Sequence, residues 1–366
     1  MGEIQLMCVA GARPNFMKVA PLLRAFLESG RIRATLVHTG QHYDPSLSDV
    51  FFSDLGIPPP DVHLGVGSGS HAVQTARVMQ AFEPVVEEKK PDFVVVVGDV
   101  NSTVACSLVA AKLCYRVAHV EAGLRSFDRT MPEELNRLLT DQLSDLLFVS
   151  EPSGLANLAR EGIPERKVHH VGNVMIDSLA RFREPARARQ AHRRLGLEAK
   201  SFALATLHRP ANVDGREGLL RVLSLLQAAA LRMPVLFPVH PRTRARLDQF
   251  GLRERLESLP GMRLCEPLGY IDFLSLMDSA AAVITDSGGV QEETTFLGVP
   301  CFTLRPNTER PITVELGTNE LLPLDPDVVG ERLDRVLRGE GKRGIVPPLW
   351  DGHAAERIRD VFLRMF

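Results

Sequence analysis

Residues 92–113, DFVVVVGDVNSTVACSLVAAKL, decide the fold class. An apolar run, 92–99, ends in Gly-Asp, and the segment 104–113 after it has the apolar spacing of a helix. The next run, RVAHVEAG (116–123), is apolar again and has a glutamate near its end. Strands that are apolar without alternation are covered on both faces, as in a parallel sheet between helices. This stretch therefore predicts a strand–helix–strand unit of an α/β protein.

The same alternation runs along most of the chain. Residues 181–200, RFREPARARQAHRRLGLEAK, interrupt it, because they are polar and basic and have no strand pattern. We therefore predict an α/β fold with two Rossmann-like, doubly wound domains, 1–172 and 173–351. The other strand candidates are 4–11, 34–40, 146–150, 168–173, 202–208, 235–240, 262–269, 281–288 and 301–305.

Composition and charge narrow the class of protein. The chain has 366 residues, a length that favours two domains, and 45% of them are hydrophobic. The net charge of −2 does not suit a nucleic-acid or anionic membrane surface. The five cysteines form no C-x-x-C pair, and the sequence shows neither a signal-peptide pattern nor a membrane span. We expect a cytoplasmic protein with reduced thiols and no metal site.

Charged side chains follow several strands of the first half. Asp99 and Glu121 lie at the ends of two strands, and Arg13 and Lys18 flank the start of the first helix. In an open α/β sheet, ligands bind beyond the carboxyl ends of the strands. With two such sheets, the expected site is the cleft between them.

The segment TMPEELNR (130–137) has two interpretations. Thr130-x-x-Glu133 is a capping-box pattern, and Glu133 and Arg137 are spaced as an i,i+4 pair. In this interpretation the leucines of the helix form its buried face, and Glu133 and Arg137 lie on the opposite one. The alternative is that Glu133 and Arg137 belong to a site with Glu121. The structural interpretation explains the position of Glu121, at a strand end, less well.

The second half carries histidines, arginines and glycines at its strand ends. TLHRPANV and PVHPRTR place His208 and His240 after strands, and NTERP adds Arg310. The strongest local pattern is TDSGGVQEE (285–293): two glycines let the backbone approach a diphosphate, Ser287 can donate to it, and the helix N-terminus favours an anion. Neither G-x-G-x-x-G nor G-K-[ST] is present, so dinucleotide and Walker-type sites are not indicated.

Taken together and in this order, GARPNFMKVAPL, GDVNST, HVEAGLRS, MPEELNR, TLHRPANV, PVHPRTR, TDSGGVQEE and NTERP resemble the motifs of the non-hydrolysing UDP-N-acetylglucosamine 2-epimerases, from residue 11 to about 320. The resemblance implies a GT-B-like fold, a homodimer, a UDP-sugar substrate and no cofactor. It also implies that the C-terminal helix, 352–366, returns to the first domain. The implied reaction interconverts UDP-GlcNAc and UDP-ManNAc by elimination and re-addition of UDP.

The resemblance also assigns roles to individual residues. The implied catalytic residues are Asp99, Glu121, Glu133 and His208. The implied substrate-binding residues are Arg13, Lys18, Arg137, His240, Phe273, Ser287, Gly288, Gly289, Glu293 and Arg310, with Glu293 on the ribose and Phe273 near the uracil.

Two departures from the family pattern concern a second, activating UDP-GlcNAc site. Gln41-His42-Tyr43 and His208-Arg209-Pro210 replace the Q-H-R and H-R-R-E-N of many bacterial members, so we expect this activation to be lost. Other functions stay open at this stage. They are a hydrolysing 2-epimerase, an epimerase of a modified sugar such as a diacetamido uronate, a GT-B glycosyltransferase and a non-catalytic UDP-sugar sensor. The acidic residues Asp99, Glu121 and Glu133 count against the glycosyltransferase and the sensor.

Overall fold

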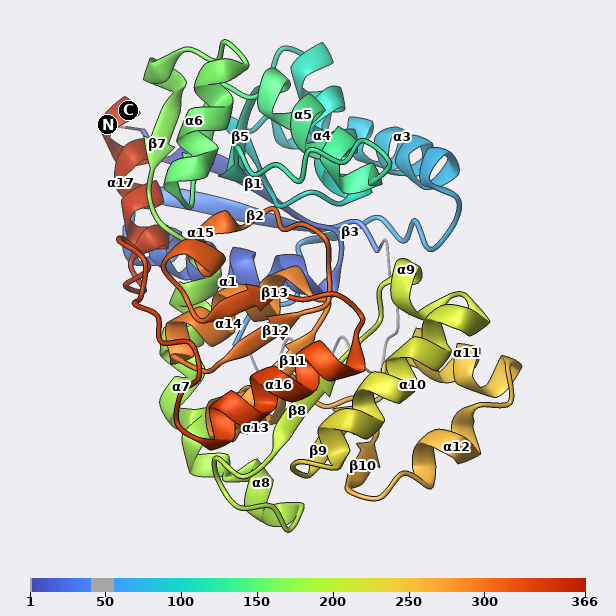
Figure 1. Ribbon diagram of the computed structural model, residues 1–366. Helices are drawn as coiled ribbons and strands as arrows, with labels where there is room; N and C mark the ends of the chain where they lie inside the picture. The colour runs from blue at the N-terminus through green and yellow to red at the C-terminus, as the bar shows by residue number, and fades with distance from the viewer. Residues whose placement is uncertain (1, 41–55) are drawn as a thin grey trace. The chain divides into compact units, whose positions relative to one another are not determined.

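The computed structural model describes residues 2–40 and 56–366, and the chain separates into two compact units. Unit 1 contains Met1–Arg181 and Pro348–Phe366, and unit 2 contains Phe182–Pro347. Each unit is built on a parallel sheet with helices between successive strands (Figure 1). The predicted α/β fold class is confirmed.

The sheet of unit 1 has seven strands within the described residues, all paired in parallel. Their order across the sheet places the first strand in the middle, as in Rossmann-like folds. That order is β3 (Val62–His63), β2 (Ile32–His38), β1 (Ile4–Ala10), β4 (Phe93–Val97), β5 (Arg116–Ala122), β6 (Leu146–Val149) and β7 (Val168–His170).

Helices cover both faces of this sheet. Alternate residues of β1 and β4, such as Met7 and Val94, pack with apolar residues of α3 and α4. The C-terminal helix α17 packs on the sheet through Phe362, whose ring lies 5.3 Å from that of Phe93. The helices of unit 1 are α1 (Arg13–Glu28), α3 (His71–Lys89), α4 (Asn101–Lys112), α5 (Pro132–Leu143), α6 (Pro152–Arg160), the 3₁₀ helix η1 (Glu165–Lys167) and α17 (Ala354–Met365).

The sheet of unit 2 repeats this topology with six strands, again within the described residues. Its order is β10 (Met262–Cys265), β9 (Val235–Pro238), β8 (Ala203–Thr206), β11 (Ala282–Thr285), β12 (Cys301–Thr303) and β13 (Asn319–Leu321). Its helices are α8 (Ala191–Arg194), α9 (Pro210–Val213), α10 (Arg216–Ala230), α11 (Pro241–Gln249), α12 (Arg253–Glu257), α13 (Tyr270–Ser279), α14 (Gly288–Leu297), α15 (Pro311–Glu315) and α16 (Pro326–Leu337). Nowhere in residues 2–40 or 56–366 does a helix reach the length and apolarity needed to cross a membrane.

The division between the units falls inside helix α7 (Val174–Arg189), nine residues after the boundary expected from the sequence. In its first half, Asp177 accepts hydrogen bonds from the backbone of Ala354 and Ala355 at the start of α17. In its second half, Arg187 pairs with Asp278 of unit 2 at 2.6 Å. One continuous helix belongs to both units, and the division coincides with the start of the polar, basic stretch 181–200.

Candidate active site

Asp99 and Glu121 lie at the same edge of the sheet in unit 1. They come from the carboxyl ends of β4 and β5, which are parallel neighbours in register from Phe93 and Arg116. Gly98, before Asp99, has φ of 67°, and this left-handed conformation turns the chain off the strand without strain. The topology therefore places two carboxylates side by side at adjacent strand ends.

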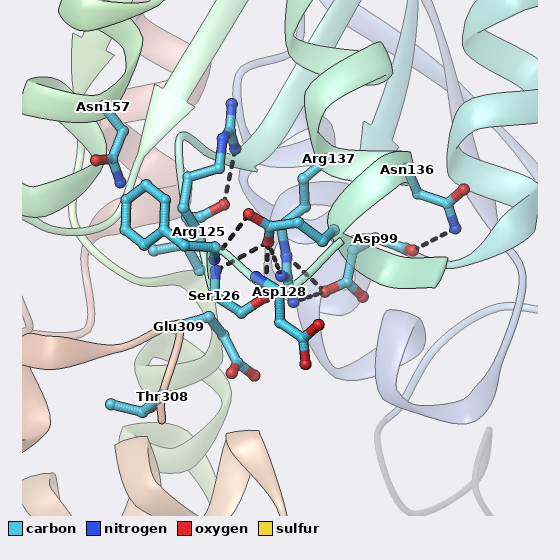
Figure 2. A network of polar contacts seen from close by, with 12 residues as sticks. Asp99, Arg125, Ser126, Asp128, Asn136, Arg137, Asn157, Thr308 and Glu309 are labelled. Atoms are coloured by element: carbon cyan, nitrogen blue, oxygen red, sulfur yellow. Dashed lines mark hydrogen bonds and ion pairs between the residues drawn. The ribbon is translucent and has the colours of Figure 1, made fainter. Parts of the chain in front are cut away.

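Asp99 is held by helix α5. Its Oδ2 accepts hydrogen bonds from Nη2 and Nε of Arg137 at 2.5 and 3.0 Å, and its backbone oxygen accepts one from Asn136 at 2.8 Å. Figure 2 shows Arg137 directed at the Asp99 carboxylate, with Asn136 on its other side. Arg137 is buried and also pairs with Glu134 at 2.9 Å. Helix α5 therefore supplies both of the side chains, Arg137 and Asn136, that hold Asp99 in place.

Glu121 is the most constrained of the predicted catalytic residues. Its φ is 77°, a conformation that is uncommon outside glycine, and the pairing of β5 with β6 is irregular between Val120 and Ala122. The Glu121 side chain is buried and forms an ion pair with Nζ of Lys18 from α1. Strained backbone persists only where its surroundings enforce it, and it concentrates at functional sites.

Glu133 lies at the start of α5, but not as the predicted capping box. The N-cap of α5 is Met131, and the Thr130 hydroxyl donates to Asp128 at 2.6 Å. Glu133 is half-buried in the second position of the helix. The neighbouring Glu134 is buried, and its carboxylate accepts from the backbone N–H of Ser126 at 2.8 Å.

The buried face of α5 is opposite to the one that the leucines predict. Leu135 and Leu139 are 38% and 55% exposed, whereas Arg137 and Asp141 are 3% and 0% exposed. The charged residues are buried because each meets a partner from a distant part of unit 1. The interpretation in which the leucines form the buried face of this helix is therefore wrong. Helix α5 buries its polar face instead.

In unit 2, the loop after β8 is organised by Asp286 at the end of the neighbouring strand β11. The buried Asp286 carboxylate accepts from the backbone N–H of His208 and Arg209 at 3.1 and 2.9 Å, and from the Asn212 side chain at 3.0 Å. Nδ1 of His208 lies 3.3 Å from Oδ1 of the same carboxylate. Burial lowers the pKa of His208, and the negative Asp286 opposes part of this effect.

His240 follows β9 and stacks on His208, with ring centroids 5.1 Å apart. It is the N-cap of α11, and its Nδ1 accepts from the backbone N–H of Arg242 at 3.1 Å. Nε2 is therefore the nitrogen that carries the proton in the neutral ring. The structure thus brings the two predicted histidines together at the carboxyl ends of adjacent strands.

The glycine-rich start of α14 lies under a buried group of charges. Ser287 is the N-cap, and Gly288 and Gly289 are partly exposed in the first turn. A Cβ at Gly288 would lie 2.8 Å from Oε1 of Glu309 and 2.9 Å from Nη1 of Arg310, so a larger residue there requires these side chains to shift. Arg310 pairs with Glu309 at 2.7 Å and with Glu292 at 2.8 Å. Arg310, Ser287 and the two glycines therefore form one cluster.

Glu293 and Phe273 belong to the same unit but lie within its packed interior. Glu293, in α14, is buried beside the hydroxyl of Tyr270, and burial, together with the neighbouring Glu292, raises its pKa to about 7. Phe273, in α13, is half-buried against the apolar cluster under the sheet.

Two predictions fall on parts of the chain that the structure does not describe. The side chain of Arg13 is one of them, although its backbone begins α1. The departure at Gln41-His42-Tyr43 also lies outside the described residues. Conversely, the sequence analysis assigned no role to Asp286 or Glu134. Asp286 follows the end of a strand, as Asp99 does. The rule that ligands bind beyond the carboxyl ends of the strands therefore also identifies Asp286 in TDSGG.

Comparison with known proteins identifies the family of this chain. The family model for UDP-N-acetylglucosamine 2-epimerase matches residues 24–363. A Methanocaldococcus jannaschii UDP-N-acetylglucosamine 2-epimerase is 40% identical, over 97% of this chain and 98% of that protein. A Pseudomonas aeruginosa UDP-2,3-diacetamido-2,3-dideoxy-D-glucuronate 2-epimerase is 37% identical, over 99% of this chain and 100% of that one.

The fold agrees as well. The crystal structure of the M. jannaschii UDP-GlcNAc 2-epimerase in complex with UDP-GlcNAc and UDP superimposes with a TM-score of 0.90, covering 99% of this chain and all of that one. The match thus extends through both units and every predicted site segment. This chain belongs to the UDP-N-acetylglucosamine 2-epimerase family.

Proposed function

We propose that this chain catalyses the reversible interconversion of UDP-GlcNAc and UDP-ManNAc. The observation that carries the proposal is the pair of carboxylates at adjacent strand ends of unit 1, each paired with a buried cation: Asp99 with Arg137, and Glu121 with Lys18. An enzyme that moves a proton at one carbon needs carboxylates at fixed positions. A protein that only binds a UDP-sugar does not.

The chemistry of the substrate explains why several groups are needed. The proton at C2 of the sugar has no carbonyl beside it and is very weakly acidic, so its removal must accompany departure of the diphosphate from C1. The products of this step are a 2-acetamidoglucal and UDP. Re-addition of UDP to C1, with a proton returned to the other face of C2, gives the epimer. Each positioned acid or base contributes about 10²–10⁴-fold.

We assign the proton transfers to Asp99, Glu121 and Glu133 and the stabilisation of UDP to unit 2. Lys18 and Arg137 keep two of the carboxylates in place, as their ion pairs indicate. In unit 2, the first turn of α14 offers backbone N–H groups to a diphosphate, with Arg310 beside them. His208, the fourth proposed catalytic residue, and His240 act on the diphosphate, and Glu293 and Phe273 contact the ribose and the uracil. The family resemblance adds Arg13 of unit 1 to the diphosphate contacts.

The non-hydrolysing outcome is part of the proposal. Glu121 and Lys18 are 6% and 8% exposed, and a site that excludes water protects a reactive intermediate from hydrolysis. The test is incubation with UDP-GlcNAc, followed by ¹H and ³¹P NMR. We expect a mixture of UDP-GlcNAc and UDP-ManNAc. Free ManNAc with an equal amount of UDP would identify a hydrolysing enzyme instead.

A second candidate substrate is a UDP-2,3-diacetamido-2,3-dideoxy-uronate, because a relative named for that sugar is 37% identical over nearly the whole chain. The same strand-end carboxylates would serve its C2 proton. Parallel assays with both UDP-sugars separate the two, and the ratio of kcat/KM values decides between them. We expect the larger value for UDP-GlcNAc.

The proposed enzyme works in the cytoplasm as a homodimer and needs no activating UDP-GlcNAc. Support for the last point is the sequence at 41–43 and 208–210, which departs from that of activated relatives. Light scattering after size-exclusion chromatography measures the oligomeric state. Activity from UDP-ManNAc alone tests the independence from activator, and an absolute requirement for added UDP-GlcNAc would contradict it.

A further inference from the structure

His119, in the middle of β5, is fully buried and has an acceptor at each ring nitrogen. Nε2 lies 2.8 Å from the backbone oxygen of Gly98, and Nδ1 lies 2.6 Å from Oδ1 of Asp141. A backbone carbonyl cannot donate a hydrogen bond, so Nε2 must carry a proton.

Asp141 links His119 to two further groups. Its carboxylate accepts from the backbone N–H of Gly123 at 3.0 Å and from Nη2 of Arg125 at 2.6 Å. Burial opposes the ionisation of Asp141, but its contacts with His119 and Arg125 lower its pKa below the ordinary value. Asp141 therefore connects His119 with the backbone of Gly123.

The buried charges compensate one another. Arg125 also donates to both carboxylate oxygens of Glu161, at 2.8 and 2.6 Å. Arg125 thus lies between two carboxylates, those of Asp141 and Glu161. A buried charge is tolerated only when it is paired and hydrogen-bonded, and this network meets both conditions.

The two hydrogen bonds of His119 hold the backbone that carries the acids. Gly98 immediately precedes Asp99, and Gly123 follows Glu121 by two residues. These segments are not regular strand, because Gly98, Glu121 and Gly123 all have φ between 67° and 82°. Such conformations persist when surrounding contacts determine them. His119 and Asp141 provide those contacts on one side, and Arg137, one helical turn before Asp141, holds the Asp99 side chain.

We propose that His119 is a positioning residue, which with Asp141 fixes the backbone of Asp99 and Glu121 for proton transfer at C2. The proposal rests on the epimerase function proposed above. It adds a pair of residues that need not touch the substrate.

The hydrogen bond to Gly98 is tested without any assay of activity. Histidine labelled with ¹⁵N reports whether each ring nitrogen bears a proton. In the full-length protein we expect Nε2 of His119 to bear a proton at neutral pH, because it faces a backbone oxygen that can only accept. An unprotonated Nε2 would overturn the proposed contact.

Three substitutions test the positioning role. His119→Asn retains a donor for Asp141 but loses the one for Gly98, and we expect kcat to fall by about 10²-fold, as small misplacement of reacting groups can do, with little change in KM. Asp141→Asn can still accept from Gly123 and Arg125, and its amide N–H can face Nδ1 of His119. It should therefore keep kcat within about tenfold.

His169→Asn is the matched control, because His169 lies on the edge strand β7 of the same sheet, away from both acids. Its kcat should equal that of the unmodified enzyme. UDP affinity, measured on all variants, reports whether the chain is folded. Normal kcat in folded His119→Asn would overturn the positioning role, whereas an unmodified enzyme without epimerase activity would refute the proposed function and leave the NMR test valid.

Discussion

The two units share a topology but place opposite chemistry at their strand ends. The central strands β1 and β8 have equivalent neighbours in the two sheets. In unit 1, buried cations hold carboxylates: Lys18 holds Glu121 and Arg137 holds Asp99. In unit 2 the roles are reversed, because carboxylates hold donors and cations.

The clearest example in unit 2 is Asp286, which orders the backbone of His208 and Arg209. Glu309 likewise pairs with Arg305 and Arg310 at 2.8 and 2.7 Å. Carboxylates suit proton transfer and cationic donors suit a diphosphate, so one fold supports two tasks through the residues at its strand ends. The comparison predicts that substitutions in unit 1 lower turnover, whereas those in unit 2 weaken UDP binding.

The largest expected effect is on turnover, in unit 1. Glu121→Gln and Asp99→Asn should each lower kcat by about 10²–10⁴-fold, because each removes a group that moves or stabilises a proton. UDP affinity, measured by calorimetry, should be unchanged. Glu87→Gln, an exposed carboxylate of α3, is the control. If Glu121→Gln kept near-normal kcat, its catalytic role would have to be abandoned.

Loss of the Asp286 charge should affect both the stability and the UDP affinity of unit 2. An amide at this position meets three donors with a single acceptor oxygen, so Asp286→Asn should lower the free energy of unfolding by about 2–3 kcal/mol. It should also weaken UDP binding by about tenfold, which corresponds to about 1.4 kcal/mol. Thermal unfolding with and without UDP measures both effects, and the exposed Asp327→Asn serves as control. Unchanged stability would mean that Asp286 does not organise this loop.

A methyl group at the start of α14 should weaken UDP binding without touching the acids. Gly288→Ala would bring its Cβ to within 2.9 Å of Glu309 and Arg310, and these side chains must shift. We expect a rise of about tenfold in the Kd for UDP, or about 1.4 kcal/mol. Gly215→Ala, where a Cβ meets nothing within 4 Å, should leave the Kd unchanged. Equal Kd values for the two variants would remove Gly288 from the binding site.

The smallest effect is a pH dependence of UDP binding. Burial raises the pKa of Glu293 from its ordinary value of 4.5 to about 7, so the free protein keeps this carboxyl protonated below about pH 7. If ribose hydroxyls donate to the ionised form, UDP affinity increases as the pH rises through about 7.

Stability should change in the opposite sense. The unfolded chain releases the Glu293 proton near pH 4.5 and the folded chain only near pH 7, so this group contributes less stability as the pH rises between these values. Glu293→Gln should abolish both trends. A UDP affinity that keeps its pH dependence in this variant would exclude Glu293 as the cause.

Sequence patterns predicted the long elements of both sheets and the residues at their ends. Continuous apolar runs such as 93–97 specify buried parallel strands, and a residue directly after such a run must lie at the sheet edge. The short edge strands β3 and β13 were not predicted, because two or three residues show no periodicity.

The sequence did not predict which charged residues are buried. Helix α5 has a leucine stripe and a charged stripe, and its charged stripe is buried because partners lie far away in sequence. Arg137 and Asp99 are 38 residues apart, and Asp141 and His119 are 22 apart. Periodicity identifies two faces of a helix, but only the tertiary partners decide which face is buried.

The central claim is that the carboxylates of unit 1 remove and return the proton at C2. Its most direct test is incubation of the enzyme with UDP-GlcNAc in D₂O, followed by NMR of both sugars. We predict UDP-ManNAc that carries deuterium at C2 and gradual labelling of the recovered UDP-GlcNAc at the same carbon. UDP-ManNAc formed without deuterium at C2, or no product at all, would contradict the account.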